Sequence, residues 1–216
     1  MEIVIMSKIS NIEIQKRNKK RYNIYIDNEY AFSVSEDVLI NEALQKGTVI
    51  DDNKLKNIIE EDNFIKCRET AFRIIERSYK SEKELKERLL EKGYNRKEII
   101  RTVEYLKEFG FVDNDKLCDI YIKSKIKTQG KKKIKYQLLH KGIDEETINR
   151  ALDSIDLDLE YEREKAIELA TKKYNLLIKK EQDIYKIKNK LYTFLAGRGY
   201  DYSIIQDAIS EIINKD

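Results

Sequence analysis

The stretch that decides the fold is Ile134–Ile148, with the sequence IKYQLLHKGIDEETI. Ile134 and Leu138 recur at the spacing of one helical face, and Gly142 then interrupts the apolar pattern. Asp144, two residues later, is a favourable N-cap because its carboxylate can accept a hydrogen bond from an unpaired backbone N–H. The stretch therefore predicts a helix, a glycine at the C′ position that follows it, and a second helix that begins at once.

This pattern occurs three times along the chain, around Gly93, Gly142 and Gly199. Aligning the three glycines brings apolar residues into register in five columns, at a period typical of helical repeat units. Proline is absent and there are only seven glycines, so each break in the pattern is informative. One large irregular helical protein is the alternative, but it does not account for the register. The five columns are Leu85, Ile134 and Leu191; Leu89, Leu138 and Leu195; Ile99, Ile148 and Ile205; Val103, Leu152 and Ile209; and Leu106, Ile155 and Ile212.

A further helix is expected before each of these pairs, at Ala71–Arg77, Leu117–Lys127 and Lys165–Lys173. In the first unit, Ser81 and Glu84 have the spacing of a capping box, which predicts that a helix starts after Ser81. The predicted fold is therefore mainly α, with three tandem three-helix repeats in a row, preceded by a small antiparallel β segment. The predicted domains are residues 1–62, 63–112, 113–156 and 157–216.

The first 62 residues carry a different pattern. Short alternating runs at residues 8–15, 22–26 and 30–34 predict a β-hairpin or meander, and Ser35 predicts the start of a short helix that ends near Gly47. The basic connection at residues 16–21 is interpreted as a solvated hairpin tip, with a binding loop as the alternative.

Composition narrows the possible functions. No apolar run reaches the roughly 20 residues that a spanning helix needs, and residues 1–6 do not resemble a signal peptide, so we expect a cytoplasmic protein without membrane contact. Cys67 and Cys118 are far apart and His140 is the only histidine, which gives neither a disulfide framework nor a metal site. We therefore predict no enzymatic activity, no metal and no cofactor. A metal-dependent nuclease built on Asp153, Asp156 and Asp158 is the open alternative, although acidic linkers are far commoner than such sites.

Charge is distributed unevenly in a chain whose net charge is only +3. The stretch Ile122–Gly142 holds eight lysines, and no Asp or Glu occurs from Ile120 to Ile143. At 100° per residue, the side chains of Lys132, Lys133 and Lys135 are expected to point away from the packed seam, so that replacing all three should alter the melting temperature little. A run of like charge without acidic partners predicts an anionic contact. The candidate binding residues are Lys123, Lys125, Lys127, Lys131, Lys132, Lys133, Lys135, Lys141, Arg77, Lys188 and Arg198.

Four motifs in this order resemble the RecX family, the regulators of the bacterial recombinase RecA. The resemblance spans about residues 66–213 and covers all three units. The matching residues are Ala71, Ile74, Arg77, Ser78, Ser81, Glu84 and Leu85; Glu104–Leu106 and Gly110–Asp113; Gly130, Ile134, Leu138 and Lys141–Ile143; and Phe194, Leu195 and Arg198–Tyr200.

The resemblance implies a non-enzymatic protein whose three-helix repeats form an elongated curved row. It implies further that this protein binds the RecA filament on single-stranded DNA and changes its assembly, ATP hydrolysis and strand exchange. It also implies a place in DNA repair, homologous recombination and the SOS response. We expect a monomer whose direct contact with DNA is weak, because a net charge of +3 is too small to hold bare DNA tightly. The alternative is a helical-repeat nucleic-acid-binding protein without a recombinase partner.

Overall fold

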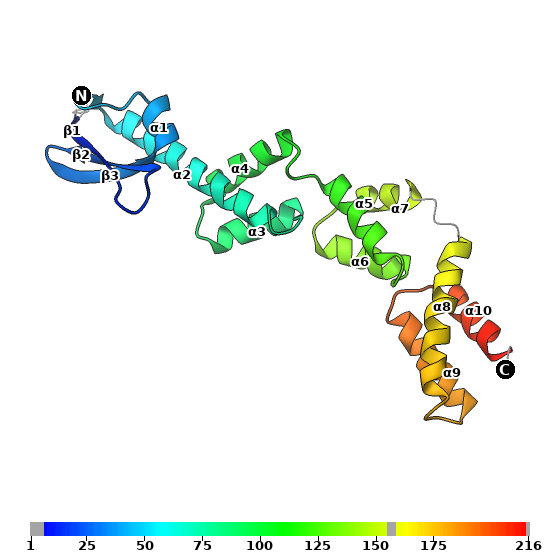
Figure 1. Cartoon of the computed structure of the whole chain (residues 1–216). Coiled ribbons are helices and arrows are strands. Elements are labelled where there is room, and N and C mark those ends of the chain that lie inside the picture. Colours follow the sequence, from blue (N-terminus) through cyan, green and yellow to red (C-terminus); the bar gives the residue numbers. More distant parts are fainter. Residues whose placement is uncertain (1–6, 155–158, 215–216) are drawn as a thin grey trace. The chain divides into compact units, whose positions relative to one another are not determined.

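The computed structural model describes residues 7–154 and 159–214, and within these ranges the chain is mostly helical (Figure 1). A small antiparallel sheet at the N-terminus has the strand order β3-β2-β1-β4, and the described strands all lie before residue 51. Asp27 and Asn28 both have positive φ, 51° and 67°, as a tight hairpin turn between β2 and β3 requires. The predicted β segment is thus confirmed. The strands and the following short helix are β1 Ser7–Ile14, β2 Arg21–Ile26, β3 Glu29–Ser35, α1 Glu36–Asn41 and β4 Val49–Ile50.

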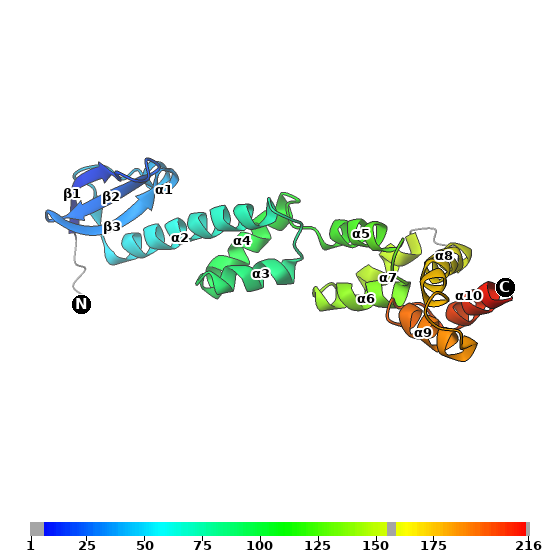
Figure 2. The same cartoon turned by 60° about the horizontal axis from the view of Figure 1, so that its bottom comes forward.

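Helix α2, Asp52–Ile75, packs on this sheet and also belongs to the first three-helix unit. Its N-cap is Asp51, whose carboxylate accepts a hydrogen bond from the Lys54 N–H at 2.7 Å. The predicted helix at Ala71–Arg77 is therefore only the end of a much longer one, and Figure 2 shows α2 running from the sheet to the side of α4. The sequence pattern was ambiguous because one helix faces a sheet along its first half and helices along its second.

A buried ion pair joins α2 to the sheet. The Asp62 side chain, 4% exposed, accepts hydrogen bonds from Arg21 at 2.9 Å and from the Ser35 N–H at 2.8 Å, and it pairs with Lys66 at 2.7 Å. Burial on its own would raise the pKa of Asp62, but these hydrogen bonds outweigh burial and lower the pKa below its usual value. The carboxylate therefore stays ionised in the folded protein.

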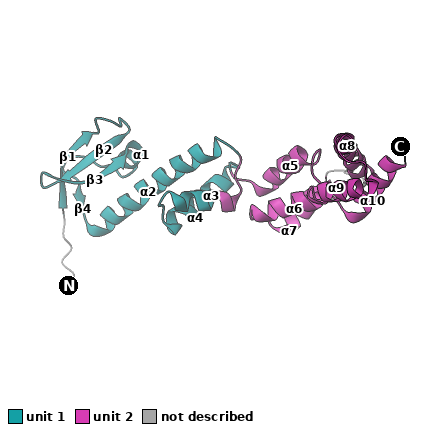
Figure 3. Ribbon diagram, turned by 90° about the horizontal axis from the view of Figure 1, so that it is seen from below, with its two compact units in different colours: residues 1–78, 85–111 teal, residues 79–84, 112–216 magenta. Residues whose placement is uncertain are grey.

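The chain forms two compact units, drawn in different colours in Figure 3. Unit 1 comprises residues 1–78 and 85–111, and unit 2 comprises residues 79–84 and 112–216, so that the first turn of α3 belongs to unit 2. The remaining helices are α3 Glu82–Glu91, α4 Arg96–Glu108, α5 Asn114–Lys125, α6 Lys131–His140, α7 Glu145–Ser154, α8 Leu159–Leu177, α9 Ile184–Ala196 and α10 Tyr202–Ile213.

The three glycine turns are confirmed in detail. Gly93, Gly142 and Gly199 have φ of +88°, +77° and +83°, the left-handed conformation that glycine adopts without strain. Each turn is a Schellman motif; after α6, for example, the Ile143 N–H donates to the Leu138 carbonyl and the Gly142 N–H to the Leu139 carbonyl. Every predicted column residue within the described ranges is buried, which confirms the register of the repeats, and Ile155 lies outside those ranges.

Candidate functional site

The predicted basic residues divide into those that have a partner among the described residues and those that have none there. Lys132 forms an ion pair with Asp201 at the start of α10, and this contact raises the pKa of Lys132. The Lys133 Nζ donates a hydrogen bond to the Gly197 carbonyl at 2.8 Å. The Lys135 Nζ donates to Glu145 on α7 at 2.6 Å and to the Asn149 side chain at 3.1 Å.

Lys132, Lys133 and Lys135 lie off the seam of the buried Ile134 and Leu138, as predicted, and the Lys132 side chain is 70% exposed. The interpretation of this stretch as like charge without partners is, however, wrong. That interpretation rested on the absence of acidic residues along the chain from Ile120 to Ile143. In space, however, other helices supply the missing acceptors, since α7 contributes a carboxylate and the segment between α9 and α10 contributes a carboxylate and a carbonyl. All three lysines thus hold α6 against its neighbours in unit 2.

The N-terminus of α6 docks onto the glycine turn that follows α9. The Gly130 N–H donates to the Arg198 carbonyl at 2.9 Å, and a Cβ at Gly130 would overlap the backbone of Gly199. The Lys131 N–H donates at 3.0 Å to Glu162, whose side chain is only 4% exposed. A carboxylate at this position also interacts favourably with the positive end of the α6 dipole.

The C-terminus of α6 repeats this arrangement with the first turn of α3. The Ser81 hydroxyl donates to the Lys141 carbonyl at 2.5 Å, and the Lys141 Nζ donates to Glu84 at 2.6 Å. The predicted capping box between Ser81 and Glu84 is confirmed, with 3.1 Å for both of its hydrogen bonds. Burial would raise the pKa of Glu84, but the hydrogen bonds from Lys141 and the Ser81 N–H outweigh it and lower the pKa. At both ends of α6, the N-cap residue of one helix donates a hydrogen bond to the carbonyl just before a glycine turn. Gly130, the N-cap of α6, donates to Arg198 before Gly199, and Ser81, the N-cap of α3, donates to Lys141 before Gly142.

A second group of predicted residues is exposed and has no ionic partner in residues 7–154 and 159–214. It contains Lys123 in the last turn of α5, Lys127 just after this helix, Lys188 on α9, and Arg77 in unit 1. Lys125 belongs to neither group. It is half-buried, and its ammonium lies 5.9 Å from the centre of the Tyr121 ring.

The structure also brings together residues that the sequence analysis did not single out. A groove of about 440 Å³ in unit 2 is lined by Lys132, Lys133 and several tyrosines from α6, α9 and α10. We call it the tyrosine groove. Its sequence signal was the spacing of Lys132 from Tyr136 and of Lys188 from Tyr192, four residues in each case, which places a basic and an aromatic residue on one helical face. The lining residues are Lys132, Lys133, Tyr136, Tyr192, Ala196, Gly197, Gly199, Tyr200, Tyr202 and Ile205.

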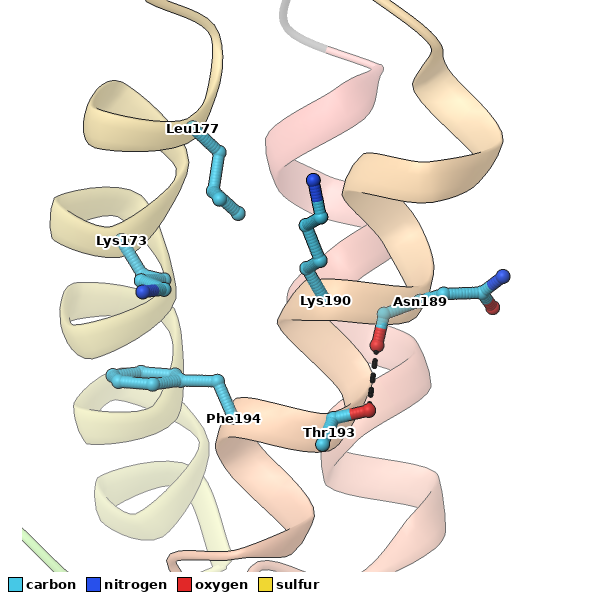
Figure 4. Close-up of a pocket in the computed structure, with 6 residues that line it drawn as sticks. All are labelled: Lys173, Leu177, Asn189, Lys190, Thr193 and Phe194. Carbon is cyan, nitrogen blue, oxygen red and sulfur yellow. Dashed lines mark hydrogen bonds between the residues drawn. The ribbon is translucent and has the colours of Figure 1, made fainter. Parts of the chain in front are cut away.

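A second groove, of about 410 Å³, lies between α8 and α9, and Figure 4 shows the side chains that line it. The Lys173 ammonium lies 5.6 Å from the centre of the Phe194 ring, and the Arg198 guanidinium lies 4.0 Å from the same ring. Lys190 pairs with Glu181 at 3.0 Å. The groove's cations thus have partners within the chain, and the predicted residue Arg198 is engaged by an aromatic ring.

The described residues offer no evident catalytic centre. Cys67 and Cys118 are free and fully buried, and burial raises the pKa of Cys118 to about 11, which disfavours the reactive thiolate. Within residues 7–154 and 159–214, no three His, Cys, Asp or Glu side chains gather in a way that could hold a metal ion. Asp156 and Asp158 of the nuclease alternative lie outside these ranges. Among the described helices, none combines the length and apolar character needed to cross a membrane.

Comparison with protein families matches four segments of the chain. Residues 7–51 match the regulatory protein RecX N-terminal domain. Residues 67–106, 116–152 and 160–209 match the first, second and third three-helix domains of RecX. The N-terminal segment, which the resemblance in the sequence did not cover, thus has a family counterpart too.

Curated relatives match over nearly the full chain. The chain is 41% identical over 211 residues to the regulatory protein RecX of Clostridium perfringens (strain 13 / Type A), covering 98% of this chain and 99% of that protein. It is 44% identical over 209 residues to the protein of the same name from Clostridium botulinum (strain Eklund 17B / Type B), covering 97% and 98%. A crystal structure of regulatory protein RecX is similar with a TM-score of 0.73 and 28% identity, covering 97% of this chain and 100% of that one.

Proposed function

Because this chain belongs to the RecX family of regulatory proteins, we propose that it is a non-enzymatic modulator of the RecA recombinase. In this proposal it binds, as a monomer, to the RecA filament on single-stranded DNA in the cytoplasm and alters filament assembly, ATP hydrolysis and strand exchange. It would act there in homologous recombination, DNA repair and the SOS response.

The proposal rests on family membership together with one observation, the exposure of Lys123 and Lys127. Both side chains are exposed, and neither has an ionic partner in the described part of the chain. Unpaired lysines pay no cost of breaking an internal contact when they meet an acidic protein surface or a phosphate. We therefore assign the contact to Lys123, Lys125 and Lys127, with Arg77 and Lys188 as further contacts.

The remaining candidates take part in the proposal by fixing the position of α6. Its lysines bond to neighbours in unit 2 at both ends of the helix, so the surface that carries them is already ordered before any partner binds. A preorganised surface loses less conformational freedom on binding. The residues of this second set are Lys131, Lys132, Lys133, Lys135, Lys141 and Arg198.

Binding to RecA filaments tests the proposal directly. We expect the wild-type protein to co-sediment with RecA filaments on single-stranded DNA and to bind the same DNA without RecA much more weakly, because a filament presents repeated protein surface to the three tandem units. It should also change the rate of ATP hydrolysis by the filament. Equal affinity for bare and RecA-coated DNA would contradict the proposal.

Charge reversal of Lys123 and Lys127 locates the contact. The double variant K123E/K127E should bind the filament about tenfold more weakly, the effect of losing roughly 1.4 kcal/mol from two modest contacts. The control is K179E/K180E, which reverses two adjacent exposed lysines of the same unit that are not among the predicted residues. Equal losses in the two variants would indicate general electrostatic attraction in place of a defined contact.

A further inference from the structure

Three exposed tyrosines lie in one groove together with two lysines. Tyr136, Tyr192 and Tyr202 are 66%, 39% and 66% exposed, and they line the tyrosine groove with Lys132 and Lys133. We propose that the tyrosine groove binds single-stranded nucleic acid by stacking its bases on the tyrosine rings. This goes beyond the proposed function, because such a groove would bind a bare strand without any recombinase.

The arrangement of the rings suits stacking. Tyr192 of α9 and Tyr202 of α10 have ring centres 6.3 Å apart and an angle of 66° between their planes, an edge-to-face contact that leaves ring surface uncovered. Tyr136 contributes a third ring from α6, close to Lys132 on the same helical face. Stacking tolerates any base, since every base has a π-face, so the expected preference is for unpaired strands over duplex and not for one sequence.

The charge of the groove fits a phosphate backbone. None of the ten described residues that line it is acidic, and two are lysines. Lys188, exposed and one turn before Tyr192 on α9, extends this positive charge along the helix. Asp201 lies next to Lys132 and offsets part of the charge, so electrostatic attraction alone is small and the rings must supply much of the affinity.

The lining distinguishes a nucleic acid from a protein segment. An acidic peptide could pair with the lysines, but its carboxylates offer no flat ring to stack on the tyrosines. An amphipathic helix needs a floor of aliphatic side chains, of which the lining has only Ala196 and Ile205. Aromatic rings that alternate with cations are the combination typical of surfaces that bind single strands.

The groove is also held open by contacts that do not involve the rings. Lys133 bonds to the Gly197 carbonyl at 2.8 Å, and its backbone lies directly against Gly199, where a Cβ would overlap it. The Gly130 N–H bonds to the Arg198 carbonyl at 2.9 Å. These links join α6 to the turn between α9 and α10, so binding would require little rearrangement.

Fluorescence anisotropy of a labelled oligothymidine with the full chain, at low salt and without RecA, tests the proposal. Wild type should bind this strand at least fivefold more tightly than a strand of equal length and charge made of abasic sites. Changing Tyr136, Tyr192 or Tyr202 to alanine should weaken binding of oligothymidine roughly five- to a hundredfold, the effect of removing one stacking ring, and should leave the abasic strand unaffected. The corresponding phenylalanine variants should retain the affinity.

The matched control is Tyr185→Ala, which removes a 73% exposed tyrosine from the first turn of α9, outside the groove, and should have no effect. Equal affinity of wild type for thymidine and abasic strands, no measurable binding, or equal losses in Tyr185→Ala and Tyr192→Ala would each overturn the proposal. Binding of an acidic peptide in preference to the oligothymidine would do so as well. RecA ATPase assays on the same variants keep the two proposals separate, since they report on the filament whether or not a bare strand binds.

Discussion

Replacing Ser81 by alanine should destabilise unit 2 by about 2 kcal/mol. The Ser81 side chain is fully buried and its hydroxyl makes two hydrogen bonds, accepting one from the Glu84 N–H at 3.1 Å and donating one to the Lys141 carbonyl at 2.5 Å. Loss of an N-cap costs about 1 kcal/mol. Loss of the second hydrogen bond costs about 1 kcal/mol more, because it leaves the Lys141 carbonyl without this donor.

The matched control is Asn95→Ala at the start of α4, in unit 1. Asn95 forms the same capping box with Glu98, at 3.0 Å for both hydrogen bonds, but it is exposed and the box involves no residue from another helix. This variant should therefore lose only about 1 kcal/mol. Urea unfolding measures the two losses, and amide hydrogen exchange assigns them, since a chain of two units need not unfold in one step.

Two results would refute the reasoning about Ser81. One is an equal cost for the two alanine variants, which would mean that the hydrogen bond to Lys141 contributes nothing. The other is faster hydrogen exchange confined to α3 in Ser81→Ala, because loss of the contact should also loosen the residues around Lys141 and Gly142. Ser81→Thr retains the hydroxyl and should recover most of the stability.

Two more predictions follow from paired charges. The variant K132E/K133E/K135E should lower the melting temperature by several degrees, whereas K123E/K127E should not, and equal melting temperatures would contradict the contacts of Lys132, Lys133 and Lys135 with α7 and the α9–α10 segment. Asp62→Asn should cost about 3 kcal/mol near pH 7, because it removes a buried, hydrogen-bonded charge. Hydrogen bonds from two basic side chains and a backbone N–H, outweighing burial, lower the pKa of Asp62 below the usual 3.8, so its contribution is complete above that pH and is lost as the pH falls through the lower folded value. Denaturation followed between pH 7 and pH 2 should thus show wild type converging on Asp62→Asn, and parallel curves would contradict the assignment.

The repeats could be predicted because their signals are local. A Schellman turn needs a glycine at C′ and apolar residues at fixed distances on both sides, and all of these lie within about 20 residues of one another. Gly93, Gly142 and Gly199 therefore located three helix pairs and nearly all of their buried positions. Helix α2 was harder, since its first half faces a sheet and its second half faces helices, and only the segment after residue 70 carried the repeat's own pattern.

The contacts of the candidate site could not be predicted in the same way. Helical geometry correctly separates the buried Ile134 and Leu138 from the neighbouring lysines, but it does not say what lies opposite those lysines. The partner of Lys132 is 69 residues further along the chain, at Asp201, and the partner of Lys141 is Glu84. Absence of acidic residues within a stretch therefore predicts little about pairing, because residues of unit 2 that are distant in the sequence supply the acidic partners.

The two ends of α6 make the same kind of contact, from a helix N-cap to the carbonyl before a glycine turn, with different residues. At its C-terminal end, Ser81 is both the N-cap of α3 and the donor to the Lys141 carbonyl, so one side chain caps a helix and joins it to the next turn. At the N-terminal end of α6 the corresponding position is Gly130, where no side chain fits.

The backbone N–H of Gly130 makes the contact to Arg198 itself, and the cap that glycine cannot provide comes from Glu162 of α8, which accepts the Lys131 N–H. The close approach of Gly130 to the Gly199 backbone leaves no room for a capping side chain on α6, so Glu162 of α8 accepts the hydrogen bond in its place. This explains why a helix with so many lysines is ordered: its charges and its first N–H groups are met by acceptors from α7, α8 and the α9–α10 segment. The same contacts leave the exposed lysines at the end of α5 as the basic side chains of this region that have no ionic partner within the described residues.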